Sequence, residues 1–480
     1  MARDNLKHRA KRGFIWNTVE RLVTNGIQFI LTVILARLLS PEDYGIIAMP
    51  AIFLAIAQVL IDSGFANALI RKQDLDEKDL STAFYFNIFV GLASYLILFL
   101  ASPFIADFFK TPILSKLLKV TALVIFFHSL GIVQQALMTK RMDFKIQAVI
   151  SACSTFLSGV IGVWMAYNGY GVWSLVFQQV SASLLRVVLL WFYGHWHPLR
   201  LWSKESFHYL WTFGNKIVII GLLDSIFNNI YAFIIGKQYN ANDLGNYTRA
   251  QQFVELPIKN IGGIVQRVTF PLLSEIQDEK KRLRDIYLKL IEMTSLLVFP
   301  LMMGLAAMAD PLIISLLGAK WSGCVIMFQV LCAAKIWTPI NSINSNLLQV
   351  KARTDLLLRV EIGKKTILIL AICLTFNYGV LYLILGYATC SVFVFIINTF
   401  YTKQLIGISL KDQFRVILPT LFISVLMLVS IAFLNSLLYS NYLKIFIDAI
   451  FGFVVFFTYL FYFKHDIFVL LKSNILKQKV

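Results

Sequence analysis

The sequence is poor in charge. Only 15% of its 480 residues are Asp, Glu, Lys or Arg, whereas 58% are apolar. Ordinary soluble domains carry charge on about a quarter of their residues. The shortage of charge therefore excludes a soluble globular domain for most of the chain and directs attention to its long apolar runs.

Several motifs of catalysis and binding are also missing. The sequence lacks a glycine-rich phosphate-binding loop, which excludes a built-in P-loop ATPase, and it lacks a basic, aromatic-studded module for nucleic acid. All five cysteines fall inside apolar runs without the spacing of metal ligands, so we expect neither a disulfide nor a metal centre. The sequence predicts no catalytic residues and no cofactor, and His128 is interpreted as an interior histidine with satisfied hydrogen bonds.

Apolar runs long enough to cross a hydrocarbon core of about 30 Å recur from end to end. In lipid the backbone must satisfy its own hydrogen bonds, so these runs predict helices. We expect an all-α polytopic membrane protein with about fourteen spans, at residues 13–38, 42–65, 81–107, 114–138, 146–167, 171–194, 211–236, 243–271, 286–309, 320–349, 359–376, 379–402, 414–437 and 443–463.

Basic residues are concentrated on one side of the predicted membrane. The segment before the first span carries five of them, and alternate loops include "KKRLR" at 280–284 and the tail after 463. Short basic loops stay in the cytoplasm, so this bias places both termini there. The net charge of +18 is mostly this topology signal.

Two connections show that the chain is internally repeated. "ILARLLSPEDYG" at 34–45 aligns without a gap with "IIGKQYNANDLG" at 234–245. In the first copy Ser40 is a predicted N-cap, and Asp43 completes a capping box three residues later. Asn240 and Asp243 take these positions in the second copy, and Gly45 and Gly245 predict close helix approach. Each copy is interpreted as a tight outer hairpin between the first two helices of one half.

The first hairpin is also a family marker. "ARLLSPEDYGIIAM", "DSGFANALIRKQDL", "LGNYTRAQQFVELP" and "FPLLSEIQDEKKRLRDIY" together resemble the Wzx-type polysaccharide exporters of the multidrug/oligosaccharidyl-lipid/polysaccharide (MOP) superfamily, over about residues 10 to 465. The resemblance implies two six-helix lobes and two extra C-terminal helices. We therefore expect a basic N-terminus at 1–12, an N-lobe at 13–194, an amphipathic cytoplasmic linker at 195–210, a C-lobe at 211–402, the extra helices within 403–463 and a cytoplasmic tail at 464–480.

Polar residues inside spans identify candidate sites, because charge in a bilayer is costly and tends to face a bundle interior or a watery cavity. Asp62, Asp224 and Glu255 are the acids best placed to carry a coupling ion. Glu255 is also four residues from Lys259, so the two alternatively form a simple pair. The residues predicted to bind substrate in a cavity between lobes are Arg21, Asn25, Lys216, Asn228, Lys259, Lys335, Ser342 and Asn346.

The resemblance implies a flippase that moves undecaprenyl-pyrophosphate-linked oligosaccharide repeat units from the cytoplasmic to the outer leaflet by alternating access. The expected partners are this lipid-linked substrate, membrane lipids, H⁺ or Na⁺ as coupling ion, and a polymerase and glycosyltransferases of surface polysaccharide synthesis. The expected location is the bacterial cytoplasmic (inner) membrane. Two alternatives stay open: a membrane-embedded polysaccharide polymerase or ligase, although its usual large outer loop is missing, and a drug exporter of the same superfamily.

Overall fold

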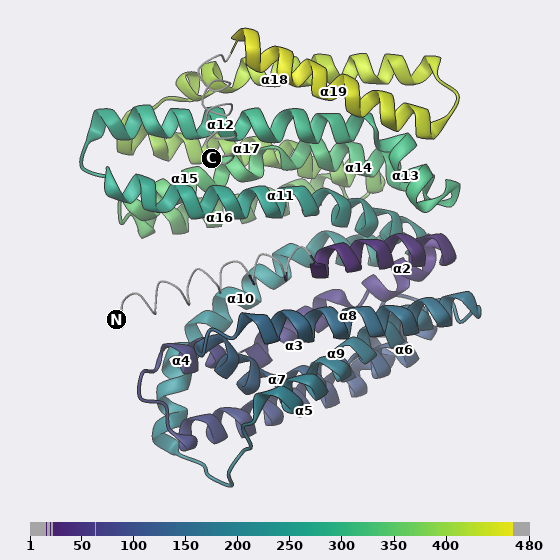
Figure 1. Cartoon of the computed structure of the whole chain (residues 1–480), viewed down its shortest axis with the longest axis vertical. Helices are drawn as coiled ribbons and strands as arrows, with labels where there is room; N and C mark the ends of the chain where they lie inside the picture. Colours follow the sequence, from purple (N-terminus) through teal and green to yellow (C-terminus); the bar gives the residue numbers. More distant parts are fainter. Residues whose placement is uncertain (1–15, 17–19, 21–22, 63, 464–480) are drawn as a thin grey trace, which may run out of the picture. The chain divides into compact units, whose positions relative to one another are not determined.

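The computed structural model of the chain describes residues 16, 20, 23–62 and 64–463. Every regular element in these ranges is a helix (Figure 1). The chain divides into two compact units, Met1–Gly245 and Asn246–Val480, which are called unit 1 and unit 2 below. Unit 1 includes α10, the helix that we expect to open the second lobe, and α10 packs there against α3, α4 and α5.

Unit 1 is a bundle in which α7 is surrounded by α5, α9, α3 and α4. Its helices are Val23–Leu38, α2 (Pro41–Ala48), α3 (Ala51–Asp62), α4 (Phe65–Arg71), α5 (Glu77–Phe108), α6 (Ile113–Thr121), α7 (Leu123–Lys140), α8 (Phe144–Tyr167), α9 (Trp173–Gly194) and α10 (Lys204–Gln238).

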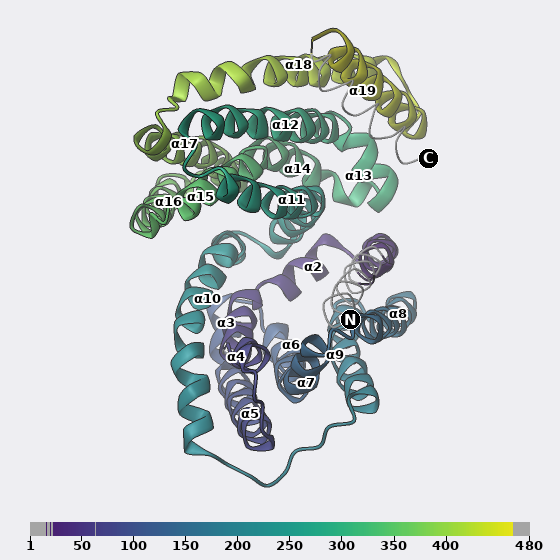
Figure 2. The same cartoon turned by 60° about the vertical axis from the view of Figure 1, so that its left-hand side comes forward.

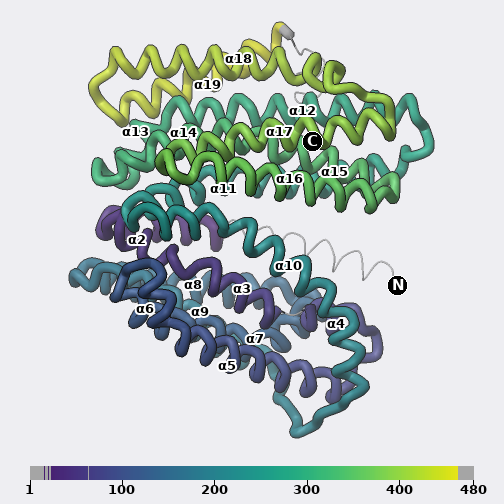
Figure 3. Tube along the Cα trace, turned by 180° about the vertical axis from the view of Figure 1, so that it is seen from behind, coloured from purple at the N-terminus to yellow at the C-terminus, as the bar shows by residue number. Residues whose placement is uncertain are grey.

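Unit 2 is built around α12 and α17, and the two C-terminal helices α18 and α19 lie beside α12 and α13 (Figure 3). Helix α11 (Ala241–Glu275) enters it from unit 1. The others are α12 (Lys280–Ala307), α13 (Ala309–Leu317), a 3₁₀ turn (Ala319–Trp321), α14 (Ser322–Lys335), α15 (Trp337–Val350), α16 (Thr354–Thr375), α17 (Val380–Ile406), α18 (Leu410–Leu437) and α19 (Asn441–Phe463).

The all-α membrane class is confirmed, whereas the count of fourteen spans is not. Among the described residues 11 helices are long and apolar enough to cross a membrane, or 12 with the bent pair Val23–Leu38 and Pro41–Ala48. The two other predicted spans coincide with α11 and α16, which are long but too polar for this criterion. Arg359, Glu361, Lys364 and Lys365 interrupt α16, for example.

The predicted hairpin caps are present in both copies. The Asp43 amide donates to Ser40 Oγ at 3.2 Å and the Ser40 amide donates to Asp43 Oδ2 at 2.9 Å, which is a capping box. The Asp243 amide likewise donates to Asn240 Oδ1 at 2.8 Å. The helices Val23–Leu38 and Pro41–Ala48 meet at an angle of 118° across the first cap.

The two hairpin copies pack against each other through their glycines. A Cβ atom on Gly45 would lie 1.7 Å from the Ala241 carbonyl oxygen, and a Cβ atom on Gly245 would lie 1.8 Å from the Pro41 carbonyl oxygen. Each contact sets the glycine of one copy against the first helical residue of the other. The close helix approach expected at these glycines is therefore confirmed, and it occurs between the two copies of the motif.

The connection between α9 and α10 is an extended segment rather than a helix over residues 195–203 (Figure 2). Gln134 Nε2 donates to the Trp196 carbonyl at 2.6 Å, and the Trp196 indole N–H donates to Glu77 at 2.9 Å. The Leu199 and Ser203 amides donate to hydroxyls of α5. Residues 195–203 are thus fastened to α5 and α7, and α10 absorbs the rest of the predicted linker.

An ion pair closes the same end of unit 1. Lys72 Nζ lies 2.6 Å from Asp79 Oδ2, and Asp79 is only 1% exposed. The hydrogen bond to Asp79 and the charge of that carboxylate raise the pKa of Lys72 above its ordinary value. A lysine whose pKa is raised by folding stabilises the folded protein fully at every pH below its ordinary pKa. This stabilisation is lost only when the pH rises through the raised pKa. The pair therefore stays charged through the physiological range.

Candidate functional site

Three of the predicted site residues come together in unit 2. Lys259 Nζ lies 2.5 Å from Glu255 Oε2, and Lys335 Nζ lies 3.7 Å from Glu255 Oε1. The Lys335 side chain is 17% exposed and that of Lys259 is 75% exposed. One carboxylate therefore holds two ammonium groups, one of them nearly buried, and the cluster carries an excess of positive charge.

Two residues that the sequence did not single out complete this cluster. Gln251 Nε2 donates to Glu255 Oε1 at 3.0 Å, and the Lys335 ammonium lies 5.4 Å from the centre of the Tyr387 ring. Gln251 is one turn before Glu255 on α11, so a helical-face argument can find it. Tyr387 is on α17, and nothing in the local sequence connects it with Lys335. We call Gln251, Glu255, Lys259, Lys335 and Tyr387 the lysine cluster.

Both main helices of the lysine cluster are irregular near their middles. Pro257 lies within α11, two residues after Glu255, and the span Ala319–Val350 changes from α14 to α15 directly after Lys335. Proline removes a backbone hydrogen bond, and a helix break frees polar backbone groups. Transporters place substrate and ion sites at such interrupted helices near the bilayer midplane. The lysine cluster lies beside two such interruptions, the proline in α11 and the break between α14 and α15.

Two other predicted residues of unit 2 lie outside the lysine cluster contacts. Ser342 Oγ donates back to the Thr338 carbonyl of its own helix at 3.2 Å. Asn346 is 3% exposed, and its Nδ2 has no hydrogen-bond partner among the described residues. Asn346 therefore faces the helix packing of unit 2, and its assignment to sugar binding remains a prediction.

The predicted residues of unit 1 are mostly at its surface. Asn25, Lys216, Asp224 and Asn228 are exposed on the helix Val23–Leu38 and on α10. Arg21 lies outside the described residues. Their shared role in one cavity remains a prediction.

Asp62, the third predicted acid, belongs to a polar cluster inside unit 1. Gln58 Nε2 donates to Asp62 Oδ1 at 3.2 Å and lies 2.8 Å from His128 Nδ1. From α9, Arg186 donates to Gln135 Oε1 of α7 at 3.3 Å. His128 therefore has the partner that its interpretation as an interior histidine expects, but this partner is shared with a carboxylate.

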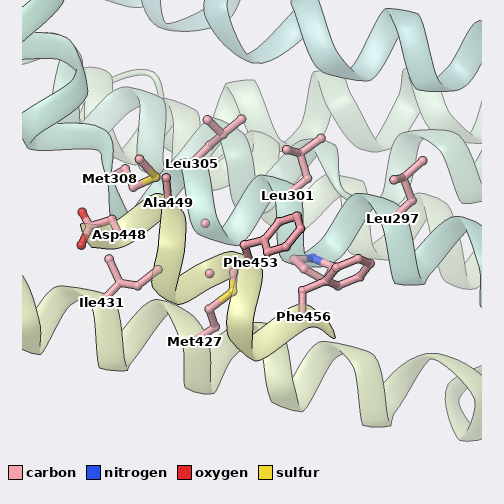
Figure 4. A pocket seen from close by; sticks show the side chains of 13 residues that line it. Leu297, Leu301, Leu305, Met308, Met427, Ile431, Asp448, Ala449, Phe453 and Phe456 are labelled. Atoms are coloured by element: carbon pink, nitrogen blue, oxygen red, sulfur yellow. The ribbon is translucent and has the colours of Figure 1, made fainter. Parts of the chain in front are cut away.

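An apolar cavity of about 280 Å³ lies within unit 2 between α12, α18 and α19 (Figure 4). Asp448 is the one ionisable residue among those that line it. Asp448 Oδ2 accepts a hydrogen bond from Asn435 at 2.9 Å, and Oδ1 is buried without a partner in the described structure. Asp448 is not among the site residues predicted from the sequence, although an acid inside so apolar a span is a usable signal.

Comparison with known proteins agrees with this architecture. A protein solved as the lipid II flippase MurJ in an inward closed conformation superposes with a TM-score of 0.76 at 17% identity, over 95% of this chain and 100% of that one. This likeness establishes the fold.

Sequence comparison adds two relatives and a family. Teichuronic acid biosynthesis protein TuaB of Bacillus subtilis (strain 168) is 27% identical over 419 residues, which is 86% of each chain. Lipopolysaccharide biosynthesis protein WzxC of Escherichia coli (strain K12) is 23% identical over 431 residues, 88% of each. The family model described as "Polysaccharide biosynthesis protein" matches residues 34–326. That match spans more than half of the chain, so this protein belongs to the polysaccharide biosynthesis protein family.

Proposed function

We propose that this protein is a flippase that moves an undecaprenyl-pyrophosphate-linked oligosaccharide repeat unit from the cytoplasmic to the outer leaflet of the bacterial cytoplasmic membrane, by alternating access. Both termini would lie in the cytoplasm. The family and the name of the MurJ structure support transport of a lipid-linked saccharide. Glycosyltransferases would supply the substrate and a polymerase would consume it. The chain itself transports and does not catalyse a covalent step.

The observation that carries the proposal is the lysine cluster. A pyrophosphate is a multiple anion, and it is bound best by cations that are already oriented. Lys335 and Lys259 supply two ammonium groups that share one carboxylate, so a phosphate oxygen can replace part of the interaction with Glu255. Attraction between opposite charges is several times stronger at the low effective dielectric of such a site than in water.

The remaining predicted residues extend this proposal. Arg21 and Lys216 would add cations for the pyrophosphate, and Asn25, Asn228, Ser342 and Asn346 would offer amides and hydroxyls to the sugars. Asp62, Asp224 and Glu255 are the acids that would respond to a coupling ion. The prenyl tail needs no polar groups and can remain in lipid.

The first test replaces Lys335 in cells that depend on this gene for surface polysaccharide. We expect Lys335→Met to lower surface polysaccharide at least about tenfold, because the loss of one strong charged contact costs 1.4 kcal/mol or more. Lipid-linked repeat units should then accumulate in the inner leaflet. Lys335→Arg should retain part of the activity because it keeps the charge but changes its geometry.

The matched control is Lys116→Met, since Lys116 is an exposed lysine of α6 in the other unit. It should leave export unchanged. Normal surface polysaccharide from Lys335→Met at wild-type protein levels would contradict the assignment of the lysine cluster.

A further inference from the structure

The polar cluster of unit 1 has no role in substrate binding as proposed above. It consists of Gln58 and Asp62, on neighbouring turns of α3, and His128 on α7. His128 Nδ1 lies 2.8 Å from Gln58 Nε2 and 3.8 Å from Asp62 Oδ1. The same Gln58 amide donates to Asp62 at 3.2 Å. Gln58 therefore stands between a carboxylate and an imidazole and contacts both.

The orientation of the Gln58 amide corresponds to one tautomer of the neutral histidine. With the amide nitrogen facing the ring, His128 Nδ1 accepts this hydrogen bond and carries no proton. When a proton from water binds to the Nδ1 lone pair, that nitrogen becomes a donor and the hydrogen bond from Gln58 breaks. The new N–H then has Asp62 Oδ1 as its nearest carboxylate oxygen. Proton uptake thus exchanges a neutral hydrogen bond for an imidazolium–carboxylate ion pair.

The surroundings suit a site that both binds and releases protons. The side chains of Asp62 and His128 are 56% and 31% exposed, so the helix packing of unit 1 does not enclose the pair completely. Helix α3 ends at Asp62, beside this pair, and Gly64 before α4 has a left-handed φ of 70°. The carbonyl end of a helix favours positive charge, including that of an imidazolium.

Another charged side chain lies on α9, which packs against α7. Arg186 donates to Gln135 Oε1 of α7 at 3.3 Å. Four cations of the surrounding helices contact other groups: Arg71 lies over Phe213, Lys119 over Phe99 and Lys145 over Trp16, and Lys140 donates to the Lys72 carbonyl. Helix α10, which packs against α3, carries Lys216 and Asp224, and both are exposed. From α5, Tyr95 packs in the adjoining apolar cluster.

We propose that His128 and Asp62 form a proton-binding pair, and that its ligand is the proton whose movement is coupled to transport. The coupling part rests on the flippase function proposed above. Histidine is the side chain whose charge ordinarily changes between pH 5 and pH 8. Gln58 acts as the positioning residue, because it holds the unprotonated imidazole beside the carboxylate.

The proton site can be tested without any substrate. The full chain is labelled with ¹³C at the ε1 carbon of histidine, placed in lipid nanodiscs and titrated by NMR from pH 5 to pH 8. The resonance absent from His128→Gln is that of His128, and it should titrate within this range. Asp62→Asn should lower the ratio of imidazolium to imidazole at a fixed pH about tenfold, because a carboxylate at this distance favours the charged form of the imidazole by about that factor.

The control is Asp107→Asn, an exposed acid of α5, which should leave the His128 titration unchanged. If His128→Gln does not fold, His128→Asn supplies the assignment instead. A His128 resonance that stays in the neutral form down to pH 5, or that responds equally to both substitutions, would overturn the proton site.

The coupling part needs proteoliposomes that contain undecaprenyl pyrophosphate with one labelled sugar. A proton gradient should accelerate movement of this probe by the wild-type chain, whereas His128→Gln should lose the acceleration and keep gradient-free exchange. Equal acceleration in both proteins, or wild-type movement without any acceleration, would refute coupling at this pair. No movement by any protein would refute the flippase function, and the NMR titration would then judge the proton site separately.

Discussion

Gly45→Ala and Gly245→Ala should each remove most of the folded protein from the membrane. A methyl group at either position would lie 1.7 or 1.8 Å from a backbone carbonyl oxygen of the other hairpin copy. Backbone cannot move aside as a flexible side chain does, so the cost should exceed the roughly 1–3 kcal/mol of ordinary overpacking. The measurement is the amount of monodisperse protein extracted in mild detergent, relative to wild type.

Gly262→Ala and Gly263→Ala are the controls for this prediction. Both glycines lie within α11, and an added Cβ would meet nothing within 4 Å. Alanine favours a helix over glycine by about 1 kcal/mol, so these variants should express at least as well as wild type. Similar yields from all four variants would show that the two hairpins do not meet as described.

Glu255→Gln should destabilise the protein more than loss of either lysine of the lysine cluster. It leaves Lys335, which is 17% exposed, without the carboxylate that lies 3.7 Å from its ammonium group, and a largely desolvated charge that loses its counter-charge is destabilising. Lys335→Met is milder because Glu255 keeps Lys259 at 2.5 Å. Thermal unfolding in detergent should therefore show a clearly lower Tm for Glu255→Gln.

The double variant Glu255→Gln/Lys335→Met separates stability from transport. It removes the isolated ammonium group, so its Tm should return most of the way to that of wild type. Transport should nevertheless remain lost, because the pyrophosphate has lost a cation. Recovery of both properties in the double variant would mean that the cluster only stabilises the fold.

The parts of the structure that sequence predicts well are those set by local spacing. The two caps at Ser40 and Asn240 depend on residues three positions apart, and both are present. The contact between Glu255 and Lys259 depends on one helical turn. Apolar runs likewise identify helices, because a membrane leaves the backbone no other partner.

The parts that sequence misses depend on tertiary packing. Nothing local brings Lys335 to Glu255, or His128 to Asp62, because each pair joins distant helices. The hydrogen bond from the Trp196 indole to Glu77, which fastens the start of the predicted linker at 195–210 to α5, likewise joins residues far apart in the sequence. Asn346 is predicted to bind substrate, yet the helix packing of unit 2 buries it.

The most direct test of the central claim uses the purified chain alone in proteoliposomes that contain undecaprenyl pyrophosphate with one labelled sugar in both leaflets. A membrane-impermeant reagent then modifies the sugars that are accessible from outside. We predict that the wild-type chain makes the inner-leaflet label accessible, and that Lys335→Met at equal reconstitution does so at least about ten times more slowly. Inner-leaflet label that stays protected in the presence of folded wild-type protein would contradict the proposed function.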